Sequence, residues 1–82
     1  MKIKYFAWLK QITKTDSEII LNENIKDINA LKKYLSLKYP KLKKYLIKED
    51  IIKVAINLEH TLKNKRLSEN DEVALFPPVS GG

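Results

Sequence analysis

The chain begins with a stretch whose successive side chains would point to alternate sides of a strand, over residues 2–9. Residues 2–9 are predicted to form a strand, because aromatic and β-branched side chains recur there with a period of two. Ile3, Tyr5 and Ala7 are expected on one side, and Lys4, Phe6 and Trp8 on the other. Apolar residues on both sides indicate that both faces are covered. After a polar loop at 11–15, residues 18–21 are predicted to pair antiparallel with this strand.

After Asp27, apolar residues recur at the spacing of a helix instead of alternating with polar ones. Aspartate favours the N-cap position, so the helix is predicted to begin there. Ser36 is expected on the outer side of this three-turn helix. Pro40 disfavours helical geometry at Tyr39 and so predicts where the helix ends. Residues 42–46 are expected to add a short turn of helix over the edge of the core. The predicted apolar stripe consists of Ile28, Leu31, Leu35 and position 37 or 38.

The second half of the chain predicts three more extended segments. Residues 51–57 form the clearest strand, 61–63 a very short one after a turn at 59–61, and 73–76 the last. Asn70 is expected to hold a left-handed conformation in the turn 67–72. One helix on a mixed sheet of four to five strands is an α+β arrangement. The first and last strands are expected to lie parallel at its centre.

Composition narrows the class of protein. Eighty-two residues, 44% of them hydrophobic, make one small globular domain. No cysteine is present, which excludes disulfides, thiolate zinc sites and cysteine nucleophiles and fits a reducing compartment. No apolar run approaches the roughly 20 residues of a membrane helix. These features predict a cytoplasmic protein that binds no membrane.

Side chains with catalytic or metal-binding potential are few. His60 lies in a predicted turn without further metal-type ligands, so we interpret it as a solvated histidine. The acidic group Glu69, Asp71 and Glu72 is typical of capping residues. The serines lack the neighbouring glycines of a nucleophile elbow. We therefore expect neither a self-contained active site nor a bound metal.

The net charge of +6 arises from 16 Lys and Arg residues against 10 Asp and Glu residues. Arg66 is the only arginine, although arginine is the residue best suited to phosphate and base recognition. Lysines and tyrosines interleave between residues 32 and 48, as single-stranded nucleic acid would require. Nucleic-acid binding is therefore a remote alternative, and an acidic protein partner is another.

The last seven residues, 76–82, contain two of the three prolines and both glycines. Pro77 and Pro78 stop a strand and stiffen the segment after it. Gly81 and Gly82 have no Cβ, so bare backbone could enter a narrow channel and present the terminal carboxylate. Phe76 is expected partly exposed on the open face of the sheet, as an anchor for a partner. A frayed terminus without function is the alternative interpretation.

Residues 71–82 strongly resemble the end of the small, sulfur-carrying subunit of the molybdopterin synthase family, and residues 5–10 and 55–59 resemble two of its strands. This family has the β-grasp, ubiquitin-like fold. The resemblance implies a β-grasp domain at 1–76 and a flexible Gly-Gly tail at 77–82. Two positions depart from the family pattern, since Asn70 stands where glycine is frequent and the loop 11–15 has no glycine.

The resemblance also implies a mechanism. An adenylating enzyme related to ubiquitin-activating enzymes would use ATP to activate the Gly82 carboxylate, and a sulfur donor protein would convert it to a thiocarboxylate. Gly81 would thread the channel of the large synthase subunit, which holds the active site, and Gly82 would give its sulfur to a cyclic pyranopterin phosphate. The implied partner-binding residues are Phe76, Pro77, Pro78, Val79, Ser80 and Gly81. No directly bound cofactor is expected.

Two related functions remain open as alternatives. The chain could carry sulfur for thiamine thiazole, although those tails usually lack the Phe-Pro-Pro stretch. It could also be a ubiquitin-like modifier joined to target lysines through Gly82, because the activated tail is chemically the same.

Overall fold

The computed structural model describes residues 1–78 of the chain. Its strands are β1 (Lys2–Tyr5), β2 (Ser17–Ile19), β3 (Lys53–Ile56), β4 (Glu59–Thr61) and β5 (Glu72–Phe76). Its helical segments are α1 (Leu9–Thr13), α2 (Ile28–Lys38), the 3₁₀ turn η1 (Pro40–Leu42) and the π-helical turn η2 (Lys44–Lys48).

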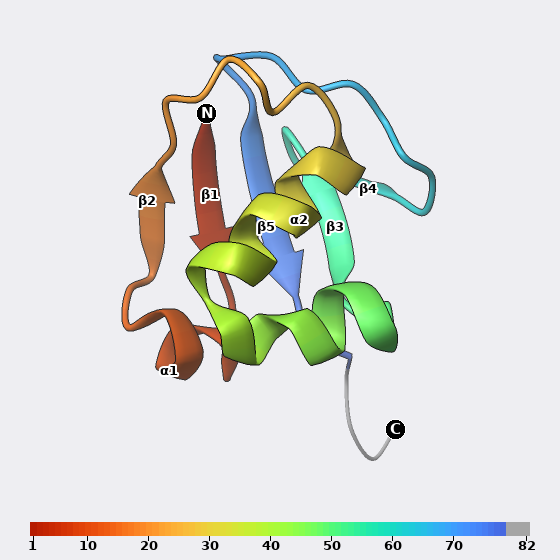
Figure 1. Cartoon of the computed structure of the whole chain (residues 1–82). Helices are drawn as coiled ribbons and strands as arrows, with labels where there is room; N and C mark the ends of the chain where they lie inside the picture. The colour runs from red at the N-terminus through yellow and green to blue at the C-terminus, as the bar shows by residue number, and fades with distance from the viewer. Residues whose placement is uncertain (79–82) are drawn as a thin grey trace.

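The strands of the described residues form one mixed sheet in the order β2-β1-β5-β3-β4 (Figure 1). β1 and β5 run parallel in its middle, with Ile3 opposite Val73 and Tyr5 opposite Leu75. The other three pairings are antiparallel. The α+β, β-grasp arrangement and the parallel central pair are thus confirmed. The chain reaches Pro77 from a strand that is hydrogen-bonded on both sides.

α2 crosses one face of the sheet and supplies much of the core (Figure 1). Asp27 caps it as predicted, because its side chain accepts a hydrogen bond of 2.8 Å from the Ala30 amide. The prediction for the last turn of α2, which put Ser36 on the outer side and position 37 or 38 in the apolar stripe, is wrong. Leu37 is 84% exposed, whereas Ser36 is buried and donates to the Lys32 carbonyl at 2.8 Å. This internal bond satisfies the serine hydroxyl, so a polar residue is tolerated at the buried position.

The first strand is shorter than predicted. It ends at Tyr5, since Ala7 has a positive φ of 53° and breaks the extended conformation. Residues 9–13, partly assigned to a polar loop, form α1, and its end is set by Lys14 at φ 64°. The expectation that both faces are covered also fails, because Lys2 is exposed and Lys4 only half-buried.

Two predicted turns are placed differently in the structure. The β3–β4 hairpin turns at Asn57 and Leu58, with φ of 50° and 73°, and His60 therefore lies in β4 rather than in a turn. Asn70 does not have the positive φ that was expected. Asp71 shapes that turn instead, because its carboxylate accepts a 2.8 Å bond from the Ser68 amide.

η1 and η2 lie at the end of the sheet where β1 and β5 finish, which we call the exit end, and they contribute the buried side chains Leu42 and Leu46 to the core. Trp8, which follows β1, packs edge-on against Tyr45 of η2 with ring centroids 4.8 Å apart. Lys53, at the start of β3, lies opposite Phe76. The expected short turn over the core is thus confirmed, and it lies beside the point where the chain leaves β5.

Candidate functional site

Three of the seven predicted site residues fall within the described part of the chain. Phe76 is the last residue of β5, and Pro77 and Pro78 follow it half-buried. Val79, Ser80, Gly81 and Gly82 lie outside the described residues, so the predicted roles of these four remain predictions. The described part of the site is therefore its foot, where the tail begins.

Phe76 belongs to an aromatic cluster on the sheet face opposite α2. Its ring stacks on Phe6, with centroids 4.5 Å apart and planes 13° from parallel, and the His60 ring lies 5.4 Å away. Parallel pairing explains the stack, because the Phe6 amide donates to the Leu75 carbonyl at 3.1 Å and so extends the β1–β5 ladder. The half-exposed position predicted for Phe76 is confirmed. Three strands thus bring Phe6, Phe76 and His60 together at the foot of the tail.

The rest of this sheet face carries small or polar side chains. Ala74 and Ala55 lie opposite each other on β5 and β3, so no large side chain rises from its centre. Lys4 and Glu72 pair across β1 and β5 at 2.8 Å, and this hydrogen bond lowers the pKa of the Glu72 carboxyl. Apolar surface on this side is therefore concentrated at the exit end, which is the composition expected of an anchor with a polar surround.

Two members of the cluster were missed at the level of sequence. The predicted strand gives Phe6 a place on its second side but no role. The predicted parallel pairing of first and last strands would have placed it beside Phe76. His60 was interpreted as a solvated turn histidine, whereas it is an exposed strand residue whose ring approaches Phe76. Leu58 and Leu62, which flank β4 and are 88% and 97% exposed, also carried no signal in the pattern.

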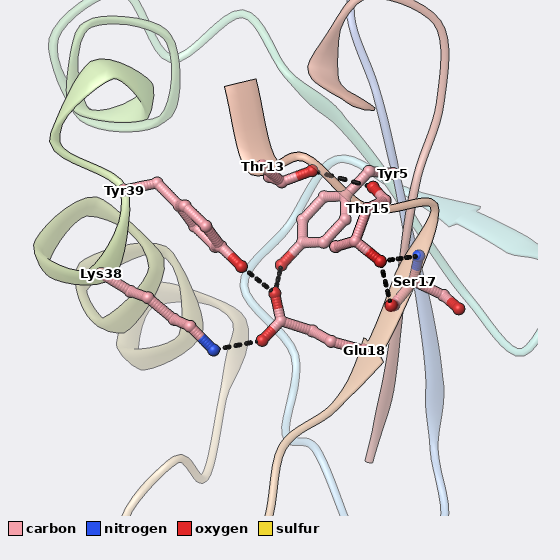
Figure 2. A network of polar contacts seen from close by, with 7 residues as sticks. All are labelled: Tyr5, Thr13, Thr15, Ser17, Glu18, Lys38 and Tyr39. Carbon is pink, nitrogen blue, oxygen red and sulfur yellow. Dashed lines mark hydrogen bonds and ion pairs between the residues drawn. The ribbon is translucent and has the colours of Figure 1, made fainter. Parts of the chain in front are cut away.

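A second polar assembly lies on the core side of the sheet, where Figure 2 shows three side chains converging on Glu18. The Tyr5 hydroxyl donates to Oε2 at 2.7 Å, and the Tyr39 hydroxyl donates to the same oxygen. Lys38 pairs with the other carboxylate oxygen, Oε1. The two tyrosine rings also meet edge to face at 6.1 Å. The carboxylate therefore joins β1, β2 and the end of α2.

The electrostatics of this assembly identify it as structural. Burial opposes ionisation of Glu18, but the three hydrogen bonds outweigh it and lower the pKa of its carboxyl. Burial, and then the bond to Glu18, raise the pKa of the Tyr5 phenol, so that phenol stays protonated as a donor. Both carboxylate oxygens are engaged, and neither faces a free reactant. The assembly is therefore a clasp between strand and helix rather than an acid–base pair, and we call it the Glu18 clasp.

The described residues were also compared with the side-chain grouping of a metal site and with the helix length of a membrane span. Among residues 1–78, no three His, Asp or Glu side chains are grouped closely enough to hold a metal ion. None of the helices described there has the length and apolar character needed to cross a bilayer. The contacts recorded within the aromatic cluster are ring contacts, with Phe76 stacked on Phe6 and the His60 ring beside Phe76.

Comparison with known proteins gives one consistent result. The model of the ThiS family matches residues 3–82. A molybdopterin synthase sulfur carrier subunit from Dictyostelium discoideum is 33% identical, over 99% of this chain and 94% of that protein. SAMP1 from Haloferax volcanii superposes with a TM-score of 0.82 at 27% identity, covering 99% and 97% of the two chains. The small archaeal modifier protein 1 of Methanosarcina acetivorans gives 0.81 at 28% identity, covering 99% and 94%.

Proposed function

The chain belongs to the ThiS family of ubiquitin-like β-grasp sulfur carriers, and we propose that within it this protein is the small subunit of molybdopterin synthase. The observation that carries the proposal is the position of Phe76. It ends a central strand, stacks in the aromatic cluster, and is followed directly by Pro-Pro-Val-Ser-Gly-Gly. A rigid strand, an apolar anchor and a stiffened tail thus follow one another without a gap.

Activation is proposed to take place at the Gly82 carboxylate. A carboxylate is a poor electrophile, so an adenylating enzyme first joins it to the α-phosphate of ATP and releases pyrophosphate. Sulfide-level sulfur supplied by a donor protein then attacks the acyl carbon, and the C–S bond forms as the C–O bond to AMP breaks, which leaves a thiocarboxylate and AMP. This scheme needs no cofactor on the carrier itself, and the sulfur rides on the main chain of a protein without cysteine.

Delivery is proposed to occur in the large subunit. The tail inserts there, and its terminal sulfur attacks a carbon of the cyclic pyranopterin phosphate, where it replaces an oxygen substituent that leaves as the C–O bond breaks. Water then cleaves the acyl–sulfur bond, so the sulfur stays on the substrate and the Gly82 carboxylate is restored. Because a dithiolene holds two sulfur atoms, two loaded carriers are consumed per product. The catalytic groups belong to the partner, and this chain is a sulfur-donating subunit.

The contacts at the foot of the tail support the proposal that this chain delivers the sulfur while the large subunit holds the catalytic groups. Phe76 and Phe6 offer apolar area to a partner, and apolar and aromatic anchors of this kind dominate the energy of interfaces. Pro77 and Pro78 hold the chain extended before binding, which reduces the entropy lost on insertion. A carrier must also dissociate, and the small apolar area with a polar surround suits a transient complex.

The two archaeal neighbours give a specific reason to keep a second function. One of them is named a modifier protein, so the same fold and tail are compatible with attachment of Gly82 to lysines of other proteins. Adenylation is common to both uses. They diverge only afterwards, when either a sulfur donor or a lysine amine displaces AMP.

The experiment is to load the full chain with the adenylating enzyme, ATP and the sulfur donor of the same organism, and to record its intact mass. Exchange of one carboxylate oxygen of Gly82 for sulfur is expected, and a chain lacking Gly82 should gain none while its circular dichroism is unchanged. If the wild-type carboxylate is unchanged with all components active, the carrier function is wrong. If covalent adducts to lysines accumulate instead, the modifier function replaces it.

A further inference from the structure

Positive charge is unevenly distributed between the two ends of the sheet. Residues 28–48 contain seven lysines and no acidic residue. Residues 22–27 and 65–72, which lie at the end where β1 and β5 begin, contain five acidic and three basic residues. The net charge of +6 is therefore concentrated on α2, η1 and η2.

Three of these lysines are neutralised by neighbours. Lys32 pairs with Asp50 at 2.7 Å, Lys38 with Glu18, and Lys44 weakly with Glu49 at 3.9 Å. Within residues 1–78, the other four, Lys33, Lys41, Lys43 and Lys48, are exposed and make no ion pair. We call Lys41, Lys43 and Lys48 the exit-end lysines, because they lie along the segment formed by η1 and η2, whereas Lys33 lies on α2.

The fold places the exit-end lysines beside the tail. Trp8 follows β1 and contacts Tyr45 of η2, and β1 ends next to β5, so η2 lies at the same end as Phe76. Figure 1 shows η1 and η2 at the end of the molecule where β5 finishes. A partner that receives the tail therefore approaches this end and meets the lysines as it does so.

The structure weighs against nucleic acid as the occupant of this surface. Binding of single strands relies on aromatic rings free to stack on bases. The Tyr39 hydroxyl is used by Glu18, the Tyr45 ring is packed on Trp8, and Tyr34 is packed against the core. No arginine lies on these elements, since the only one is Arg66. Lysine charge without a stacking platform suits long-range attraction more than base recognition.

We propose that the exit-end lysines dock an acidic rim on the large subunit, around the mouth of the channel that takes the tail. This inference rests on the proposed function and identifies the surface that the partner recognises there. Its main effect is on the association rate, because exposed charges steer an encounter over a Debye length of about 8–10 Å and add little to the final affinity. Lysine, a hydrated point charge, also permits the release that a carrier requires.

The test is the association rate of the full chain with the large subunit of the same organism, measured by stopped flow from low to high salt. The variant K41E/K43E/K48E reverses the three charges. The matched control K2E/K26E/K65E makes the same change in net charge on exposed side chains near the end of the sheet where β1 and β5 begin. We expect the first variant to associate about tenfold more slowly or worse at low salt, with a flattened salt dependence. The control should stay within about threefold of the wild type.

Further variants and a second ligand distinguish local docking from net charge and from nucleic-acid binding. K41R/K43R/K48R keeps the charge and should keep the rate. Equal slowing of both glutamate variants would mean that only net charge matters, and unchanged rates in both would remove the docking surface; either result overturns the inference while wild-type binding upholds the proposed function. No binding by the wild type overturns both. Salt-sensitive binding of a single-stranded oligonucleotide, lost only in K41E/K43E/K48E while partner association is unchanged, would assign the surface to nucleic acid.

Discussion

The two faces of the sheet are made by the same strands but differ in what their side chains do. On the face under α2, Ile3, Val73 and Leu35 are fully buried, and the polar groups that occur there are joined in the Glu18 clasp. On the opposite face, alanines occupy the centre and the aromatic cluster lies at one end. Alternation along β5 assigns Leu75 to the first face and Phe76 to the second.

This difference separates folding from recognition within one strand. Core residues of β5 hold it between β1 and β3, which fixes the direction of the chain at Pro77. On the opposite face, Phe6 and Phe76 remain partly exposed and are available to a partner. Substitutions on the two faces should therefore fail in different assays, stability for one and association for the other.

The largest effect is expected in the core face. Leu35→Ala removes a side chain with no exposed surface and should cost about 3 kcal/mol of unfolding free energy, through lost burial and the cavity left behind. Urea unfolding measures this directly. Leu37→Ala, on the exposed side of the same helix, is the matched control and should stay within about 0.5 kcal/mol of the wild type. Equal losses at both positions would contradict the assignment of the faces.

The second largest effect is expected for a substitution on the open face, and it should appear as weaker binding to the large subunit. Phe76→Ala removes the anchor of the aromatic cluster, so the dissociation constant for the large subunit should rise by about tenfold to a hundredfold. Calorimetric titration measures it, with urea unfolding run beside it. Ile19→Ala, on the edge strand β2 and 63% exposed, should bind like the wild type. A Phe76→Ala variant that binds normally, or that loses binding only because it unfolds, would contradict the separation of folding from recognition.

A smaller effect is expected at the Glu18 clasp. Glu18→Gln should cost about 1–2 kcal/mol at neutral pH, because charge-assisted hydrogen bonds are lost. The pKa of the Glu18 carboxyl is lowered by folding, so the unfolded chain binds more protons as the pH falls below the ordinary glutamate value of about 4.3. The stabilisation is therefore complete above that value and is lost as pH falls through the lowered pKa. The difference between wild type and variant should shrink in acid.

Unfolding by urea at several pH values checks this dependence. Some acid sensitivity should persist in the variant, because hydrogen bonds also lower the pKa of Asp27, Asp71 and Glu72. Glu69→Gln, at an exposed position in a loop, is expected to leave stability within about 0.5 kcal/mol. A wild-type advantage over Glu18→Gln that stays constant down to low pH would show that the clasp does not act through the charged carboxylate.

Local patterns in the sequence were enough to predict several elements. The apolar stripe of α2 from Ile28 to Leu35, its Asp27 cap and its end before Pro40 were predicted correctly, as was the central pairing of first and last strands. The site was predictable at Phe76, because strand alternation sets its direction. The predicted role of tail residues 79–82 rests on glycine and proline chemistry and on the family resemblance, and these four residues lie outside the described part of the chain.

The errors arise where tertiary contacts outweigh local preference. Ser36 is buried because its hydroxyl bonds within the helix, which no apolar pattern reveals. The hairpin places Leu58 at a positive φ that its residue type disfavours. The Glu18 clasp joins residues far apart in the sequence, as no local motif does. Phe6 could have been found by combining two correct predictions, the strand alternation and the parallel pair.

The central claim is that this chain delivers sulfur from Gly82 to the substrate held by a large synthase subunit. The most direct measurement mixes the thiocarboxylated chain with that subunit and the cyclic pyranopterin phosphate, and follows the intact mass of the carrier through a single turnover. We expect the carrier to return to its carboxylate form as dithiolene product appears, with two carriers used per product. A carrier that keeps its sulfur, or yields it only to a thiazole-forming enzyme, would contradict the claim.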